Sequence, residues 1–262
     1  KVDLTTYQES IDNYMQIKDF VKGSSIQDAP VIPISAQHKL NMDALIGSIE
    51  ETIKTPTRSK YSEPMMHVLR SFDINKPGIS LEQIKGGVLG GALSQGELNV
   101  GVEVEIRPGL WDEKKNKYEP VRTKIATLGT GAGLVENVKP GGLVAIGTLL
   151  DPSYVKSDSL IGSVVGLPEK LPKDVEEITL DYQLFETAVG THEMIKVDPI
   201  RNKESLRLNI GTAATLGTVM YTKDKRVEIK LKRPVCMLEK SRVAISRRIG
   251  DRWRLIGSGI TA

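Results

Sequence analysis

From residue 65 onward the chain consists of short apolar segments separated by glycine-rich turns, and this pattern restricts the fold more than any other feature. Turn signals recur about every 8–12 residues, which is typical of a closed β-barrel or a sandwich. The clearest segments are MMHVLRSFDI, GGVLGGALSQG, VGVEVEIRPG and GGLVAIGTLL, followed after residue 174 by EEITLDYQLF, ESLRLNIGT, RVEIKLKRPVCML and SRVAISRRIG. We therefore expect two small β-domains, divided near the LPEKLPKD stretch at residues 167–174.

Two of these segments alternate strictly between apolar and polar residues. The VEVEI segment at residues 102–106 is expected to bury one face and to leave the other, with Glu103 and Glu105, in water. The later strand alternates likewise, with Val227, Ile229 and Leu231 on one face and Glu228, Lys230 and Lys232 on the other. The YTKDKRV stretch before it predicts a hairpin turn.

The first 54 residues have a different character. Residues 5–22 and 41–54 carry apolar side chains at helical spacing, with Asn41 as the expected N-cap, and the β-branched run at residues 31–34 predicts a buried strand. This order is typical of an α/β sheet. One strand between helices cannot form a stable sheet, so we expect the other strands to be missing or supplied by another molecule. Residues 55–64 read as a polar linker.

Composition limits the function. The chain is 39% hydrophobic and 26% charged, and no apolar run approaches the roughly 18 residues of a membrane helix, so no membrane partner is expected. A single cysteine, Cys236, favours a reducing cytoplasm. Residues 201–262 carry 15 Lys and Arg against 5 Asp and Glu, whereas residues 1–200 carry 21 against 28. This basic end suits a polyanionic partner, or is a solvated surface.

The residues that could carry chemistry are KVD at the start of the chain and SAQHK at residues 35–39. A carboxylate such as that of Asp3 can accept hydrogen bonds from the N1–H and N2–H₂ donors of guanine. Lys1 could lay its aliphatic stem along the base, and backbone N–H groups near Ala36 could donate to O6. The alternative is a chance occurrence of both short motifs.

These motifs resemble the Asn-Lys-x-Asp and Ser-Ala-x boxes of translation GTPases, with the leading Asn absent from this chain. The GGVLGGALSQGELNVGVEVEIRPG segment resembles the second-domain barrel of elongation factor Tu-like proteins. Together with RSFDINKPG, KVDPIRNKESLRLNIGTAATLGTV and AISRRIGDRWRLIGSGI, the chain resembles the gamma subunit of archaeal and eukaryotic translation initiation factor 2, from residue 1 to residue 262.

The resemblance implies the end of a P-loop GTPase α/β domain at residues 1–58, followed by two all-β barrel domains at residues 62–168 and 172–262. It implies GTP-dependent delivery of initiator methionyl-tRNA to the small ribosomal subunit, in a heterotrimer with alpha and beta subunits. The guanine-binding positions it implies are Lys1, Asp3, Ser35, Ala36 and Gln37, the last departing from the commoner Leu or Lys.

The phosphate-binding end of such a site is not found in the sequence. No GxxxxGK[ST] loop and no DxxG stretch occurs among the 262 residues. We therefore expect no catalytic residue in this chain, no GTP hydrolysis by it as given, and the Mg²⁺ ligands in a missing N-terminal part.

Two surfaces are candidates for partners. The long loop at residues 73–87, with Asn75, Lys76 and Gly78, resembles the loops that hold the alpha subunit, although a structural turn is an equal alternative. A basic cluster could bind tRNA or ribosomal RNA, or be ordinary solvated charge. Its members are Arg242, Arg247, Arg248, Arg252 and Arg254.

The histidines show no metal-ligand spacing. His38, His67 and His192 lie far apart in sequence and share no ligand pattern with Cys236, so we expect no metal site and an inert, packed thiol. Two other functions are kept open. One is another tRNA-delivering GTPase, such as the selenocysteine-specific elongation factor, and the other is a non-enzymatic β-barrel scaffold for partner subunits.

Overall fold

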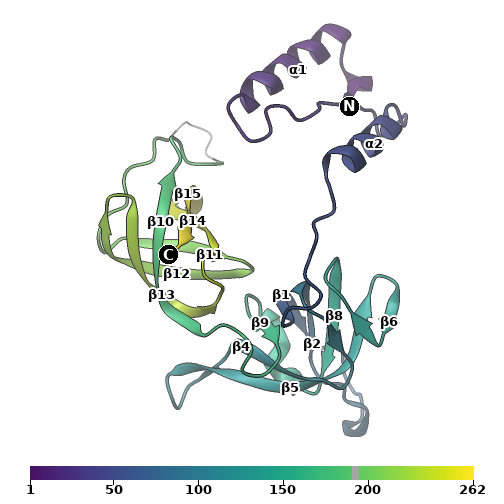
Figure 1. The fold of residues 1–262 in the computed structure, drawn as a ribbon, viewed down its shortest axis with the longest axis vertical. Coiled ribbons are helices and arrows are strands. Elements are labelled where there is room, and N and C mark those ends of the chain that lie inside the picture. Colours follow the sequence, from purple (N-terminus) through teal and green to yellow (C-terminus); the bar gives the residue numbers. More distant parts are fainter. Residues whose placement is uncertain (191–194) are drawn as a thin grey trace. The chain divides into compact units, whose positions relative to one another are not determined.

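The computed structural model describes residues 1–190 and 195–262 (Figure 1). The chain divides into two compact units, Lys1–Thr57 and Arg58–Ala262.

The first unit contains a short 3-10 helix, Val2–Leu4, and two α-helices, α1 (Tyr7–Val21) and α2 (Met42–Thr52). Helix α1 begins with a capping box: the Glu9 amide donates to the Thr6 hydroxyl at 3.3 Å, and the Thr6 amide donates to the Glu9 carboxylate at 2.8 Å. Both helices therefore form where the apolar spacing predicts them. Neither helix contains a buried residue, because this unit has no sheet for them to cover.

The strand expected at residues 31–34 is not formed in this unit, all of whose residues are described. The segment is extended but mostly half-buried, and the carbonyl of Ile34 accepts from the amide of Val2 at 3.2 Å. A strand needs a partner strand for its backbone groups, and none lies beside it. Asn41 also differs from expectation: it sits at the N-cap position with φ of 56°, but its side-chain amide donates to the Pro33 carbonyl instead of capping α2.

The second unit begins with a barrel. Six strands pair in the cyclic order β4-β9-β1-β2-β8-β5, and antiparallel pairing of β4 with β5 closes the ring. These strands are β1 (Met65–Phe72), β2 (Val88–Gln95), β4 (Glu103–Asp112), β5 (Lys117–Thr130), β8 (Leu143–Thr148) and β9 (Val164–Gly166). This part of the chain also contains three short strands, β3 (Leu98–Asn99), β6 (Gly133–Val135) and β7 (Asn137–Val138). Two 3-10 segments, Leu81–Gln83 and Pro152–Asp158, lie between the strands.

A second closed barrel follows, with the strand order β10-β13-β12-β11-β14-β15. Its strands are β10 (Asp174–Leu184), β11 (Ser205–Ile210), β12 (Ala213–Lys223), β13 (Arg226–Cys236), β14 (Arg242–Ile249) and β15 (Arg252–Thr261). The predicted hairpin between β12 and β13 is present, with Asp224 and Lys225 both at positive φ, as a two-residue type I′ turn requires.

Each barrel encloses its own apolar core, built from alternate residues of its strands. The predicted alternation of β13 is confirmed, because Val227, Ile229 and Leu231 are buried and the residues between them are exposed. The prediction for the earlier strand is wrong at Glu105, which is only 2% exposed. Its side chain lies on the outer face of β4, where Arg107 and Arg122 cover it instead of water.

Among the described residues, no helix is both long enough and apolar enough to cross a membrane.

The closed second barrel predicts a contrast between two neighbouring positions of β11. Leu208 is fully buried, so Leu208→Ala should lower the free energy of unfolding by about 2–5 kcal/mol through the lost contacts and the cavity that remains. Arg207 is exposed on the same strand, and Arg207→Ala should change the free energy of unfolding by less than about 0.5 kcal/mol. Urea unfolding of both variants measures the difference, and equal losses would contradict the assigned inside and outside of the strand.

Candidate functional site

Two residues far apart in the first unit meet at its candidate binding site. Asp3 lies in the short 3-10 helix and is exposed, whereas Ser35 is completely buried at the end of the extended segment. A hydrogen bond from the Ser35 side chain holds the pKa of the Asp3 carboxyl below its ordinary value, and the charge of His38 acts in the same direction. Asp3 therefore stays ionised, with both carboxylate oxygens as acceptors, to a lower pH than an ordinary aspartate.

The loop after Ser35 is a tight turn. Ser35 and Leu40 exchange two backbone hydrogen bonds, of 3.3 and 3.0 Å, and the amide of His38 donates to the Ser35 hydroxyl at 3.3 Å. Ala36 and Gln37 are exposed at the tip of this turn. Within this fully described unit their amide N–H groups donate to no carbonyl, so both are free to face a ligand.

Lys1 is exposed beside the same loop, and its backbone nitrogen lies 2.9 Å from the carbonyl oxygen of Ile34. The structure thus brings together all five positions that the sequence singles out here. The result is a carboxylate next to an exposed turn that carries two N–H groups without a backbone acceptor. Such a set can accept two hydrogen bonds and donate one or two, which complements the Watson–Crick edge and O6 of guanine.

The loop at residues 73–87 is organised by Asn75. Its side-chain oxygen accepts from the Lys85 amide at 2.8 Å, and its amide nitrogen donates to the Lys85 carbonyl and to Asp73, both at 2.7 Å. These bonds fit the structural turn that the sequence offers as the alternative, and an Asx pair two residues apart is a known turn signal. Lys76 and Gly78 are exposed beside it and help line a hollow of about 420 Å³.

The five arginines of the basic cluster are not equivalent. In the β14–β15 ladder Arg247 lies opposite Arg254, and Ile249 lies opposite Arg252. Four of the arginines therefore lie at the turn end of this hairpin. Arg242 pairs with Ile260 at the other end of the hairpin, away from the rest.

Arg247 is also used within the barrel. Its guanidinium binds the Glu204 carboxylate and donates to the carbonyls of Asp198 at 2.8 Å and Pro199 at 3.2 Å. Arg248 is exposed and reaches only Asp251, at 3.6 Å. Arg252 forms no ion pair with any residue that the structure describes. At this end of the hairpin, the cations most available to a partner are therefore Arg248 and Arg252.

In the described part of the chain, which includes His38 and His67, no three His, Cys, Asp or Glu side chains are placed to hold an ion. His192 lies outside the described residues. Cys236 is buried, and burial raises the pKa of its thiol to about 12, which agrees with the expected inert, packed role.

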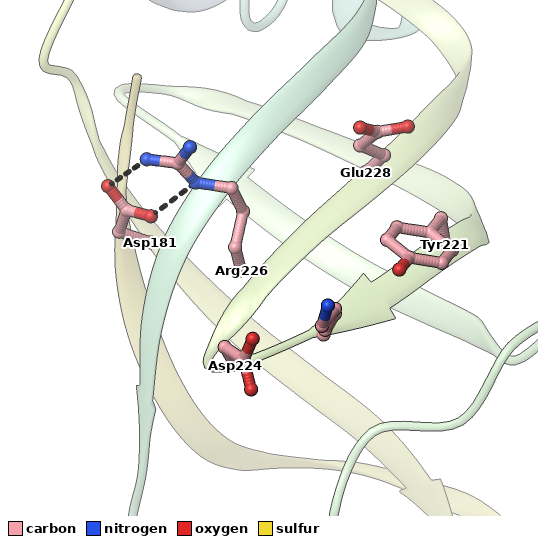
Figure 2. Close-up of a pocket in the computed structure, with 6 residues that line it drawn as sticks. Asp181, Tyr221, Asp224, Arg226 and Glu228 are labelled. Atoms are coloured by element: carbon pink, nitrogen blue, oxygen red, sulfur yellow. Dashed lines mark hydrogen bonds and ion pairs between the residues drawn. The ribbon is translucent and has the colours of Figure 1, made fainter.

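A further hollow, of about 360 Å³, lies on the outside of the second barrel (Figure 2). Arg226 binds the Asp181 carboxylate there through two hydrogen bonds, of 2.8 and 3.2 Å. Tyr221 and Glu228 face each other across the ladder and complete the wall together with Asp224. The lining carries charges of both signs, and the guanidinium of Arg226 is already paired with Asp181. This hollow therefore indicates no particular ligand.

Comparison with known proteins extends these observations. The family model described as "Initiation factor eIF2 gamma, C terminal" matches residues 176–261. The translation initiation factor 2 subunit gamma of Archaeoglobus fulgidus is 52% identical over 260 residues, covering 99% of this chain and 61% of that protein. The corresponding protein of Methanococcus vannielii is 48% identical over 262 residues, with 99% and 64% covered. The chain thus spans less than two thirds of these relatives.

Solved structures show the same fold at low identity. The apo crystal structure of translation elongation factor SelB from Methanococcus maripaludis matches with a TM-score of 0.73 and 17% identity, covering 100% of this chain and 56% of that one. The same factor in complex with the GTP analogue GPPNHP gives a TM-score of 0.74, also at 17% identity, with 100% and 57% covered.

The contact between Asp3 and Ser35 predicts a measurable titration. Removing the hydroxyl in Ser35→Ala should raise the pKa of Asp3 toward its ordinary value of 3.8, because the largest lowering influence is lost. In the native protein this contact stabilises the fold at pH values above 3.8. The stabilisation is lost as the pH falls through the lowered pKa of Asp3. A carbon-detected NMR titration of the Asp3 carboxyl measures it, with Ser25→Ala as the control. An unchanged Asp3 titration in Ser35→Ala would contradict the contact.

Proposed function

Because these 262 residues belong to the gamma-subunit family of translation initiation factor 2, we propose that they recognise the base of GTP and carry partner surfaces of a GTP-dependent initiator-tRNA carrier. The observation that carries this proposal is the meeting of Asp3 with Ser35 beside a turn with free N–H groups. Soluble factors of this family act in translation initiation.

The protein would recognise guanine both with a hydrogen-bond acceptor and with hydrogen-bond donors. The Asp3 carboxylate accepts from N1–H and N2–H₂ of guanine, and Ser35 holds that carboxylate in place and ionised. The amides of Ala36 and Gln37 donate to O6, and the stem of Lys1 covers one face of the ring. Adenine would leave the carboxylate and the amides unpaired, and a site of this kind rejects such a base strongly. Because the Gln37 contact uses its backbone, its unusual side chain has little consequence.

Hydrolysis of GTP is a proposal for the whole protein. Phosphoryl transfer depends on a phosphate-binding loop and Mg²⁺, and no GxxxxGK[ST] or DxxG motif occurs within residues 1–262. The residues described above fit a base, and in the described part of the chain no three His, Cys, Asp or Glu side chains are placed to hold an ion. We therefore assign them binding and specificity, with residues 1–58 as the nucleotide-binding part and residues 62–168 and 172–262 as the barrel domains.

The proposed partners are the alpha and beta subunits, initiator methionyl-tRNA and the small ribosomal subunit. The loop ordered by Asn75 presents Lys76 and Gly78 and would contact the alpha subunit. The end of the β14–β15 hairpin, with Arg248 and Arg252, would contact RNA phosphates.

A role in selenocysteine delivery is the second candidate. The fold match to SelB favours it, but at 17% identity that match shows the architecture alone, whereas the initiation-factor relatives are near 50% identical. A scaffold that only joins protein partners is the third. It would need neither an ionised Asp3 nor a turn with free amides.

Base specificity tests the main proposal. In Asp3→Asn one acceptor becomes a donor, so guanine loses the hydrogen bond to its 2-amino group and keeps only an uncharged acceptor for N1–H, while xanthine, which has a carbonyl in place of the 2-amino group, gains a partner. At about 1.5–3 kcal/mol for each bond, GDP affinity should fall on the order of 100-fold or more, and XDP affinity should rise. Titration of the full-length protein with fluorescent GDP and XDP measures both.

Asp19→Asn is the matched control, because this exposed carboxylate lies on α1 away from the loop. If Asp3→Asn binds GDP as tightly as the control does, guanine is not read by Asp3, and the scaffold role becomes the better description.

The RNA surface predicts a change in salt dependence. Arg248→Ala and Arg252→Ala should each lower the slope of log affinity for initiator tRNA against log salt concentration by roughly one, because each removes one phosphate contact. Arg207→Ala, an exposed cation on β11, should leave the slope unchanged. Equal slopes in all three variants would place the RNA elsewhere.

A further inference from the structure

The connection between the two barrels is itself packed. Residues 167–173 link β9 to β10, and Leu171 in this connector is 9% exposed. It forms a small separate core with Met65 and Val164 of the first barrel and Cys236 of the second. The Cys236 thiol donates to the Pro172 carbonyl at 3.3 Å. The connector is therefore part of a shared core and not a loose linker.

A charge network crosses the same junction. Arg107 of β4 donates through Nη1 to Glu105 at 2.9 Å, and through Nε and Nη2 to Oδ2 of Asp174 on β10, at 3.2 and 3.0 Å. One guanidinium thus joins a carboxylate of the first barrel to a carboxylate of the second. Arg122 extends the network, because it binds Glu105 at 3.0 Å and Glu169 of the connector at 3.1 Å.

This network is poorly suited to stabilising the fold. Glu105, Arg107 and Asp174 have side-chain exposures of only 3%, 23% and 17%, so their ionic groups are largely removed from water. Oδ1 of Asp174 is buried and has no partner in the described part of the chain. Burial raises the pKa of the Asp174 carboxyl, and the contact with Arg107 opposes this only in part. At Arg107 the two carboxylates outweigh burial and raise the pKa of the guanidinium. The uncompensated loss of hydration therefore lies at Asp174, which also carries the unpaired oxygen.

The other contacts between the barrels are less directional. Arg233 of β13 lies 5.4 Å from the centre of the Tyr118 ring and 3.4 Å from the Ser163 hydroxyl. Gly162 lies so close to Ala213 that a Cβ on this glycine would be 2.7 Å from the Ala213 Cα. Contacts of this kind tolerate small displacements of one barrel against the other. The hydrogen bonds from one planar guanidinium to two carboxylates do not, because three N–H donors must each stay aligned with an oxygen.

We propose that the Glu105–Arg107–Asp174 network is an orientation clamp: it sets the angle between the two barrels while adding little to their stability. The apolar core around Leu171 supplies the adhesion, and the clamp selects one arrangement among those that this core would allow. This role concerns the barrels alone and does not depend on the proposed recognition of guanine.

The test separates orientation from stability. Spin labels at the exposed strand positions Lys124→Cys and Lys230→Cys report the distance between the barrels by pulsed electron paramagnetic resonance. Native Cys236 can stay, because it is buried and its pKa of about 12 keeps it an unreactive thiol at neutral pH.

The informative variant is Arg107→Met with Asp174→Leu, which replaces the pair by apolar side chains of similar size. Its Tm should stay within a few degrees of the parent, while the distance distribution should shift or become at least twofold wider. Arg107→Met alone should lower Tm clearly, because Asp174 is then buried without a partner. Asp174→Asn, which keeps the shape, should give an intermediate width.

Arg226→Met with Asp181→Leu is the matched control, since this pair has a similar geometry but is exposed and lies within the second barrel. It should leave the distance distribution unchanged. The proposal is overturned if the clamp variant keeps the parental distribution, if the control widens it equally, or if the clamp variant loses as much stability as Arg107→Met alone or fails to fold.

Discussion

Pairing of backbone N–H and C=O groups is the constraint on which the rest of this structure depends. Both β-domains satisfy it by closing into six-stranded barrels, so every long strand has a neighbour on each side. The first unit offers no such neighbour. Residues 31–34 have the composition of a buried strand but pair with no other strand there. The same sequence preference thus gives a strand or an extended segment according to what lies beside it.

The candidate base-recognition site is built from local contacts for this reason. The Ser35–Leu40 backbone pair, the His38 amide and the Asp3 carboxylate hold the turn without help from a sheet. Each contact satisfies a buried or ionised group, and together they leave the tip of the turn with free donors. A small site of this kind can be specific for a base without contributing any of the chemistry at the phosphates.

The barrels serve a different purpose, because their rigid outer faces determine which side chains a partner can reach. Arg247 and Arg248 are adjacent in sequence, yet one is enclosed by Glu204 and two carbonyls while the other projects into water. Asn75 likewise orders a loop through its side chain and leaves Lys76 exposed. Partner surfaces on such a scaffold are therefore defined by exposure and pairing, and not by the local density of charge.

The sequence by itself determined the two β-domains, the two N-terminal helices and the inward face of β13, because each depends on periodicity within one segment. It also singled out the five residues, from Lys1 to Gln37, that we propose to bind guanine. Only the tertiary structure decided the fate of Glu105, which alternation places in water but the covered outer face of β4 buries between two arginines. It also decided that residues 31–34 form no strand, that Asn41 does not cap, and that Arg242 lies apart from the other arginines. In each case the outcome rests on partners distant in sequence, whose pairing and desolvation no local pattern encodes.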